Sequence, residues 1–367
     1  MKIDTQKIKA KFGEYLKFLR GKKYSPFVVG LLATILVWIF GAIFVFIITR
    51  PRTERPVAPK PSVEEIRQGP VARRALDGLA VAEGWVEPYV CAAMIDNHVD
   101  ARPQSGLSKA SLVFEIPAES GITRFMALFL AGQPVEKIGP IRSARPYYID
   151  YASEFGAAYL HVGGSPAALE KLSSKTSAVT NMDEYFLGKT FYRSRDRLAP
   201  HNTYTSNTSI EAYLQSKDLK ANYAPWLFRD DSKAEEISGK KGVKIAFSTP
   251  AYEAEWRYDL ETNDYLRYTG RTKYKDQDGS EVRAKNVAVV VTTSQVLDNA
   301  GRLSVKTTGE GKAYVIQEGK VIEGKWKKYS ATDRLRFFDA DDNEVEFVAG
   351  VTWVEVVFDE RKVMITE

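Results

Sequence analysis

The 367-residue sequence predicts an α+β protein, in which one N-terminal transmembrane helix precedes a mixed α/β N-terminal domain and a smaller β-rich domain. Three observations lead to this prediction. Residues 27–49 carry no charged side chain. Strand-like and helix-like patterns alternate over residues 75–228, whereas hairpin patterns follow one another over residues 242–367 without a long amphipathic helix.

The uncharged segment, FVVGLLATILVWIFGAIFVFIIT, is long enough to cross a bilayer, which needs about 20 apolar residues in a helix. It lacks the polar face of a helix that packs on a soluble domain. Residues 1–26 carry a net charge of +6, and the positive-inside bias places this tail in the cytoplasm and the C-terminal domains outside. A cleaved signal peptide, the alternative, would have a shorter apolar region of about 7–15 residues. We therefore expect an uncleaved signal anchor and a single-pass protein of the cell membrane.

The distribution of charge also bears on partners. The whole chain carries +5, so the part outside the tail is close to neutral and lacks the basic excess of a general nucleic-acid binder. We expect the cell membrane as a partner through residues 27–49, cell-wall polymers or envelope proteins as further candidates, and no nucleic acid.

Residues 50–74 are expected to form a stalk. Five prolines lie between positions 51 and 70, and such a stretch favours an extended chain of about 3.1 Å per residue. Cys91 is the only cysteine, which excludes an intramolecular disulfide and a zinc site built on several thiolates. It lies in the apolar run YVCAAMI, so we expect a buried, inert thiol.

The N-terminal domain begins with a buried strand, EPYVCAAMID, that ends at Asp96. The stretch SLVFEIPAESGITRFMALFLA predicts a hairpin whose register sets Glu115 opposite Arg124. PYYIDYASEF predicts a short helix with Pro146 in its first turn, and AAYLHV predicts the next strand. Ser165 then serves as the N-cap of a helix that opens with PAALEKL.

A polar segment rich in helix and strand breakers, residues 229–241, is the predicted linker between the two domains. Three hairpins follow it, in WRYDLETNDYLRY, AYVIQEGKVIEGKW and LRFFDADDNEVEFV, and VTWVEVVF predicts a closing strand. The spacing of Asp339, Asp341 and Asn343 imitates the start of a calcium loop, but Glu344 stands where that loop needs glycine, so a hairpin turn explains it better.

Several stretches resemble, in order, a family of bacterial envelope proteins. They are MIDNHVDARPQSGLSKASLVFE, IGPIRSARPYYIDYASEF, YLHVGGSP, APHNTYTS, YDLETNDYLRY, GEGKAYVIQEGKVIEGKW and GVTWVEVV, and the match covers roughly residues 75–357. The chain is similar to the YerB-like family, whose function is unassigned. The resemblance implies a mixed α/β domain followed by a β-rich one. No catalytic residues are agreed for the family, so none can be carried over. Many members look like lipoproteins with an acylated cysteine, which this chain lacks near residues 27–60.

An anion site is the best-supported functional candidate. A strand that ends in Gly163-Gly164-Ser165 and turns into a helix presents free backbone N–H groups and the positive end of the helix dipole. Arg142 and Arg145 precede that strand and can grip a carboxylate or phosphate in bidentate fashion. The alternative is that both arginines brace the fold by pairing with Asp150, Glu154 or Glu115. The residues expected to line the site are Asp96, Asn97, Arg124, Arg142, Ser143, Arg145, His161, Gly163, Gly164, Ser165, His201 and Asn202.

Three other chemistries are weaker candidates. HVGGSPA resembles a nucleophile elbow, but Ala167 replaces its last glycine; His161 or His201 would be the base and Asp96 or Asp150 the acid. Asp96, His98 and Asp100 alternate in a spacing that a metal can use, although an ordinary histidine at a strand end is the simpler explanation. For a glycosidase pair, nothing in the spacing favours any two of Glu115, Glu119, Asp150 and Glu154.

The sequence therefore predicts a membrane-anchored, extracytoplasmic binding or scaffold protein of the bacterial cell envelope that recognises an anionic wall component. A wall-modifying hydrolase, metal-dependent or based on Ser and His, is the alternative. A binding role is favoured over an enzymatic one, and no cofactor or metal is expected.

Overall fold

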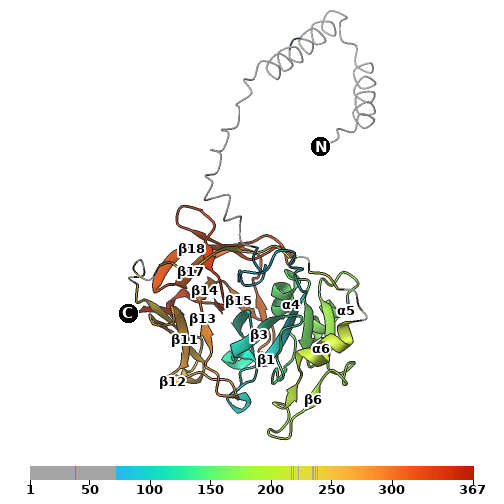
Figure 1. Ribbon diagram of the computed structural model, residues 1–367. Helices are drawn as coiled ribbons and strands as arrows, with labels where there is room; N and C mark the ends of the chain where they lie inside the picture. Colours follow the sequence, from blue (N-terminus) through green and yellow to red (C-terminus); the bar gives the residue numbers. More distant parts are fainter. Residues whose placement is uncertain are drawn as a thin grey trace, which may run out of the picture. The chain divides into compact units, whose positions relative to one another are not determined.

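The computed structural model describes residues 72–367, except 216, 218, 222, 234, 236 and 238, and also Trp38 (Figure 1). The described chain from residue 72 onward belongs to one compact unit, Pro70–Glu367. The predicted tail (1–26), the segment 27–49 apart from Trp38, and the stalk up to residue 71 lie outside the described residues.

The predicted fold class is wrong, because the described chain is dominated by sheets. Among its described residues are 22 strands but only three α-helices, α4 (Pro146–Ser153), α5 (Pro166–Ser173) and α6 (Asn207–Leu214), of eight residues each. The expected mixed α/β domain with a separate smaller β domain is not what forms. Local patterns identify strands, but they do not say which distant strands pair, and this pairing decides the architecture.

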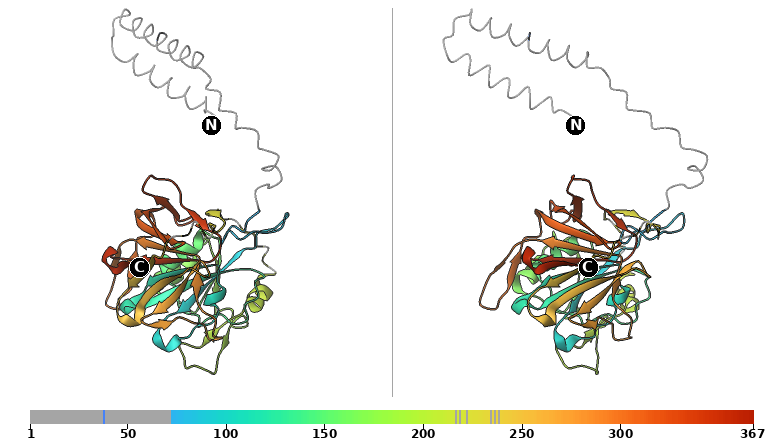
Figure 2. Two further views of the ribbon diagram at one scale, coloured as in Figure 1. Left: turned by 60° about the vertical axis from the view of Figure 1, so that its left-hand side comes forward. Right: turned by 90° about the vertical axis from the view of Figure 1, so that its left-hand side faces the viewer.

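The main sheet has ten strands that come from both sides of the predicted linker (Figures 1 and 2). Its spatial order is β19 (Arg336–Asp339), β18 (Lys320–Lys328), β17 (Gly309–Gln317), β14 (Asn286–Val291), β21 (Thr352–Val357), β2 (Leu112–Pro117), β3 (Thr123–Leu130), β1 (Val90–Asp96), β4 (Ala158–His161) and β5 (Thr180–Asp183). The two halves meet where β2 pairs in parallel with β21, with Leu112 opposite Thr352.

A second sheet runs in the order β12 (Thr272–Lys273), β11 (Asp264–Thr269), β10 (Glu253–Asp259), β9 (Gly242–Ala246) and β22 (Val363–Thr366), with β13 (Arg283–Ala284) paired to β11. Three two-stranded sheets complete the described part: β15 (Ser294–Val296) with β16 (Leu303–Val305), β20 (Glu346–Val348) with β8 (Leu227–Arg229), and β6 (Tyr192–Arg193) with β7 (Thr203–Tyr204).

Alternation along the strands builds one core on each face of the main sheet. Phe114 and Met126 lie in the core that also contains Tyr148 of α4 and Leu172 of α5. Val113 of β2 and Phe125 of β3 lie in the other core. This core also contains Trp256 and Tyr265 of the second sheet and Ile210 of α6. Since successive strand side chains point to opposite faces, α4 and α5 cover one face and the second sheet with α6 covers the other.

The hairpin of β2 and β3 forms, but its predicted register is wrong by one residue. Glu115 lies opposite Phe125, and Ile116 lies opposite Arg124. The cause is a three-residue turn, Glu119–Gly121, in which Ser120 has a φ of 60°. A shift by one residue moves a side chain to the other face of the sheet, so Glu115 and Arg124 point to opposite faces.

The local predictions for the helices are confirmed. Pro146 is the first residue of α4, and Ser165 caps α5 by accepting a hydrogen bond from the backbone N–H of Ala168. Cys91 is 1% exposed in β1, as expected for a buried thiol. Burial, and then the charge of Glu211, raises the pKa of the Cys91 thiol to about 12.

Candidate functional site

Most of the predicted site residues gather at one edge of the main sheet. Strands β1, β4 and β5 are parallel, and their carboxyl ends lie at Asp96, His161 and Asp183. Residues 139–145 run along this edge, where the Arg142 N–H donates to the Met94 carbonyl at 2.8 Å and the Val162 N–H donates to the Arg142 carbonyl at 3.1 Å. In open α/β sheets ligands bind outside the carboxyl ends of parallel strands, so this edge is the candidate site.

Asp96 is the centre of the first group of charges at this edge. Its side chain is buried, and its Oδ2 lies 2.7 Å from Nδ1 of His201 and 3.0 Å from Nε of Arg142. Its Oδ1 accepts the backbone N–H of His98 at 2.9 Å. A carboxylate can only accept, so Nδ1 of His201 carries a proton. The contact with Arg142 lacks hydrogen-bond geometry at Nε and is an ion pair.

Glu119 is the centre of the second group. Arg145 donates to both of its carboxylate oxygens, from Nε at 2.5 Å and from Nη2 at 2.8 Å, and Arg124 lies 3.5 Å away. Burial acts to raise the pKa of Glu119, but the hydrogen bond and charge of Arg145 and the charge of Arg124 outweigh it and lower the pKa. Burial, followed by the charge of Arg145, lowers the pKa of Arg124. Arg124 also donates from Nη1 to the Ser143 carbonyl at 2.8 Å.

The glycine turn after β4 uses its polar groups within the protein. The Gly163 N–H donates to Asp183 Oδ1 at 2.9 Å, and the Ser165 N–H donates to the Ala144 carbonyl at 3.3 Å. His161 is fully buried, with Nδ1 2.8 Å from the Gly163 carbonyl and Nε2 2.7 Å from Asn181 Oδ1. Because the Gly163 and Ser165 N–H groups already have these partners, an anion at this edge would depend mainly on the arginines.

The remaining predicted residues are spread around the same edge. Asn97 is buried and faces inward, where its amide donates to Thr123 at 2.7 Å. Asn202 lies on the loop before β7 and accepts from Arg193 at 3.2 Å. The bracing partners that the sequence indicated for Arg142 and Arg145 are engaged elsewhere: Glu115 binds Arg267, Glu154 binds Arg334 and Asp150 binds Lys171.

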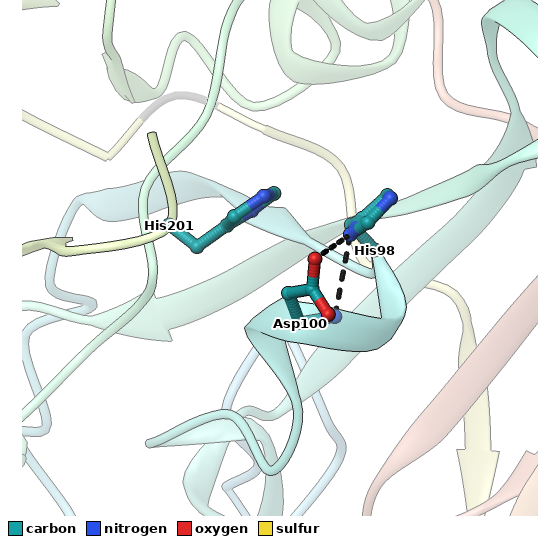
Figure 3. Close-up of side chains that lie close together, drawn as sticks. All are labelled: His98, Asp100 and His201. Carbon is teal, nitrogen blue, oxygen red and sulfur yellow. Dashed lines mark hydrogen bonds and ion pairs between the residues drawn. The ribbon is translucent and has the colours of Figure 1, made fainter. Parts of the chain in front are cut away.

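Sequence reasoning missed two features of this edge. Glu119 appeared only as a candidate glycosidase carboxylate, although its position in the hairpin turn brings it to Arg145. The second missed feature is the proximity of His98 to His201. Their rings stack with centroids 4.8 Å apart (Figure 3). About 100 residues separate the two histidines, and no sequence signal reports contacts at that range.

The fold and this edge together define a class of protein: a sheet-dominated chain with a cluster of arginines, carboxylates and histidines at the carboxyl ends of three parallel strands. The chain belongs to the DUF3048, or YerB-like, family, as the resemblance in the sequence indicated. Residues 76–220 match the "Protein of unknown function (DUF3048) N-terminal domain", and residues 243–354 match the corresponding C-terminal domain.

Two comparisons with individual proteins agree with this family. The chain is 33% identical over 290 residues to the "Putative lipoprotein YerB" of Bacillus subtilis (strain 168), over 77% of this chain and 86% of the relative. It is also similar to the crystal structure of the YerB protein from Bacillus subtilis, with a TM-score of 0.72 and 31% identity. That match covers 81% of this chain and 100% of the solved one.

The predicted localisation needs correction. The relative bears the name of a lipoprotein, a kind of protein that lipid rather than a helix holds at the membrane. Within the part of the chain that the structure describes, no helix has both the length and the apolar character needed to cross a bilayer. Residues 27–49, apart from Trp38, lie outside that part. The name of the relative is thus the finding against the predicted transmembrane signal anchor and single-pass localisation.

Proposed function

We propose that this chain is an extracytoplasmic binding protein of the bacterial cell envelope that recognises an anionic wall component, a carboxylate or a phosphate. The relative is named a putative lipoprotein, and this name supports a location in the cell envelope. The binding site lies at the carboxyl edge of β1, β4 and β5, where Arg142 and Arg145 come together with Asp96 and Glu119.

The charge of the Glu119 group is the observation that carries this proposal. Among the described residues, both Arg124 and Arg145 form their ion pairs with Glu119, which leaves the group with a net charge of +1. All three side chains are largely shielded from water, with exposed fractions of 9%, 13% and 18%. A charge in a partly buried setting is screened less than one at the surface, so it attracts an anion more strongly.

Arg142 supplies the direct contact with the ligand. Its side chain is 27% exposed, and its ion pair with Asp96 is made through Nε. Within the described residues its two terminal nitrogens have no protein partner, so they remain available to an oxyanion. A planar guanidinium matches the two oxygens of a carboxylate or phosphate better than a lysine does.

The alternative of a Ser/His hydrolase has no comparable support. Ser165 Oγ accepts the Ala168 N–H as a helix cap, and both ring nitrogens of His161 lie against other partners in the described chain. A nucleophile needs a base within hydrogen-bond reach, and no described contact joins these two side chains.

Binding of purified full-length protein to wall fragments tests the proposal. One set of fragments carries peptide carboxylates and the other carries phosphate, so the two arms identify the anion. We expect Arg142→Gln to weaken binding at least about tenfold while the variant stays folded with at most a small fall in Tm, because His201 and the His98 N–H still bind Asp96. Arg302→Gln is the matched control, since Arg302 also forms a partly exposed ion pair, with Asp298 at 3.2 Å. If Arg142→Gln binds both kinds of fragment as tightly as the wild type, the proposal fails.

A further inference from the structure

His98, Asp100 and His201 form a cluster of metal-ligating side chains at the rim of this edge. His98 and Asp100 belong to the short turn that follows β1, and His201 lies on the loop that leads into β7. One donor atom from each residue lies within 4.8 Å of the others (Figure 3). Two segments far apart in the sequence therefore bring two imidazoles and a carboxylate to one place.

We propose that His98, Asp100 and His201 bind a divalent transition-metal ion with the ligand preferences of zinc. Zinc favours imidazole nitrogen and carboxylate oxygen, and sites with three protein ligands leave a fourth position for water or a ligand. This site goes beyond the anion-binding function proposed above, because it adds a cation to the same edge.

Asp96 prepares His201 for this role. The 2.7 Å contact places the proton of His201 on Nδ1, facing Asp96 Oδ2, so the lone pair of Nε2 is free. Histidines that ligate metals usually donate their other N–H to a carboxylate or carbonyl, which fixes the tautomer and raises the basicity of the ligand. Asp96 is 2% exposed and is held by Arg142 and by the His98 N–H, so it is a rigid positioning residue.

His98 and Asp100 present a second indication of a cation. Nδ1 of His98 accepts the backbone N–H of Asp100 at 3.2 Å, so its lone pair points toward this turn. The Asp100 carboxylate oxygen lies 3.4 Å from the same Nδ1. The Asp100 N–H offsets the repulsion between these two acceptors in part, and a cation bound by both of them would offset the rest. In a tetrahedral site with bonds of about 2.0–2.1 Å, neighbouring ligand atoms are about 3.3 Å apart, close to this spacing.

Binding requires a local movement of the exposed partners. The rings of His98 and His201 are stacked with an interplanar angle of 16°, so no single ion lies in the planes of both. Asp96 holds His201, whereas the side chains of His98 and Asp100 are 34% and 71% exposed and have room to turn. We therefore expect His98 to rotate toward Nε2 of His201 when the ion binds.

Zinc binding to metal-free, full-length protein tests this site. Isothermal titration gives the affinity and stoichiometry, and the visible spectrum with cobalt reports the coordination geometry. We expect one ion per chain and a tetrahedral cobalt spectrum. His98→Ala, Asp100→Asn and His201→Ala should each weaken zinc binding more than tenfold, and Asp96→Asn should weaken it by about 10-fold to 100-fold through the tautomer of His201.

Asp196→Asn is the control, because Asp196 is an exposed carboxylate (66%) on a nearby loop and is not part of the cluster. Circular dichroism and the Tm of each variant show whether it has folded. Folded cluster variants that bind zinc like the wild type, or a wild type that takes up no zinc at micromolar concentration, would overturn the proposal. These measurements contain no wall fragment, so they succeed or fail independently of the anion-binding function.

Discussion

Arg267 of β11 donates to Glu115 of β2 at 2.5 Å, and both side chains are 1% exposed. This ion pair joins the second sheet to the main sheet inside the core. Glu355 of β21 lies beside it, fully buried, and accepts a hydrogen bond from Trp256 Nε1 at 2.7 Å. One arginine therefore faces two carboxyl groups. Burial, and then the charge of Glu115, raises the pKa of Glu355 well above its ordinary value, so Glu355 is the neutral member.

The two glutamates should respond differently to the same substitution. Glu115→Gln leaves the buried Arg267 charge without a partner and is expected to reduce the free energy of unfolding by about 3–5 kcal/mol. At about pH 4, where Glu355 is largely neutral in the unfolded chain as well, Glu355→Gln replaces one neutral group by another of similar shape, so its effect should stay within about 1 kcal/mol. Urea denaturation of the two variants at about pH 4 measures this difference. Equal losses would show that Glu355 is ionised in the native protein.

The raised pKa of Glu355 also predicts a dependence on pH. A carboxyl group with a raised pKa in the folded state stabilises the protein fully below its unfolded value, about 4.3, and this contribution is lost as the pH rises toward the folded value. Relative to Glu355→Gln, the wild type should thus lose stability between pH 4 and neutrality. Thermal melts over this range measure it; parallel curves for the two proteins would refute the assignment.

Glu318 provides the opposite case. Burial acts to raise its pKa, but hydrogen bonds from Arg229 and Ser232 lower the pKa to about 2. Its stabilising effect is present above the unfolded value of about 4.3 and is lost as the pH falls toward 2. Glu318→Gln should cost about 2 kcal/mol at pH 7 and little at pH 2. Glu323→Gln, at an exposed position (66%) of the neighbouring β18, is the control and should change neither value.

Strand and helix positions could largely be predicted from the sequence, but their partners could not. Pro146 and Ser165 mark the starts of α4 and α5 because proline at the first turn and serine at the cap are local signals. The parallel pairing of β2 with β21 joins residues about 240 positions apart, and no local pattern encodes it. The register of the β2–β3 hairpin depended on the length of its turn, which the sequence did not fix.

In the candidate site, too, the local segments could be predicted from the sequence but their interaction partners could not. That the segment 142–145 would meet the turn after β4 was a prediction from chain order, and both lie at one edge. The ion-pair partners were not predictable, since Asp96 and Glu119 reach the arginines through the register of β1 and the geometry of one turn. The boundary at residues 229–241 stays a prediction.

Glu119 and Arg145 should show energetic coupling. Their two hydrogen bonds are partly buried, so we expect Glu119→Gln and Arg145→Gln each to cost about 1–3 kcal/mol and the double variant to cost less than the sum. A double-mutant cycle in urea measures the coupling. The same cycle on Glu255 and Arg257, a more exposed pair with an Arg257 side chain that is 46% exposed, should give less than about 1 kcal/mol. Strict additivity for the first pair would exclude the bidentate contact.

Cys91 should be unreactive in the native protein. Its thiol is 1% exposed and its pKa is raised to about 12, whereas thiol reagents attack the thiolate. We expect a chromogenic disulfide reagent to react only as fast as the chain unfolds, and at full speed in denaturant. Rapid labelling under native conditions would mean that β1 is accessible.

The proposed binding function requires that an anion binds beside Arg142 at the carboxyl edge of β1, β4 and β5. A crystal structure of the full-length protein with a bound wall fragment tests it most directly. In that structure the carboxylate or phosphate group should lie within hydrogen-bond distance of the terminal nitrogens of Arg142. A fragment bound elsewhere on the protein, with Arg142 and Arg145 still paired only to Asp96 and Glu119, would contradict it.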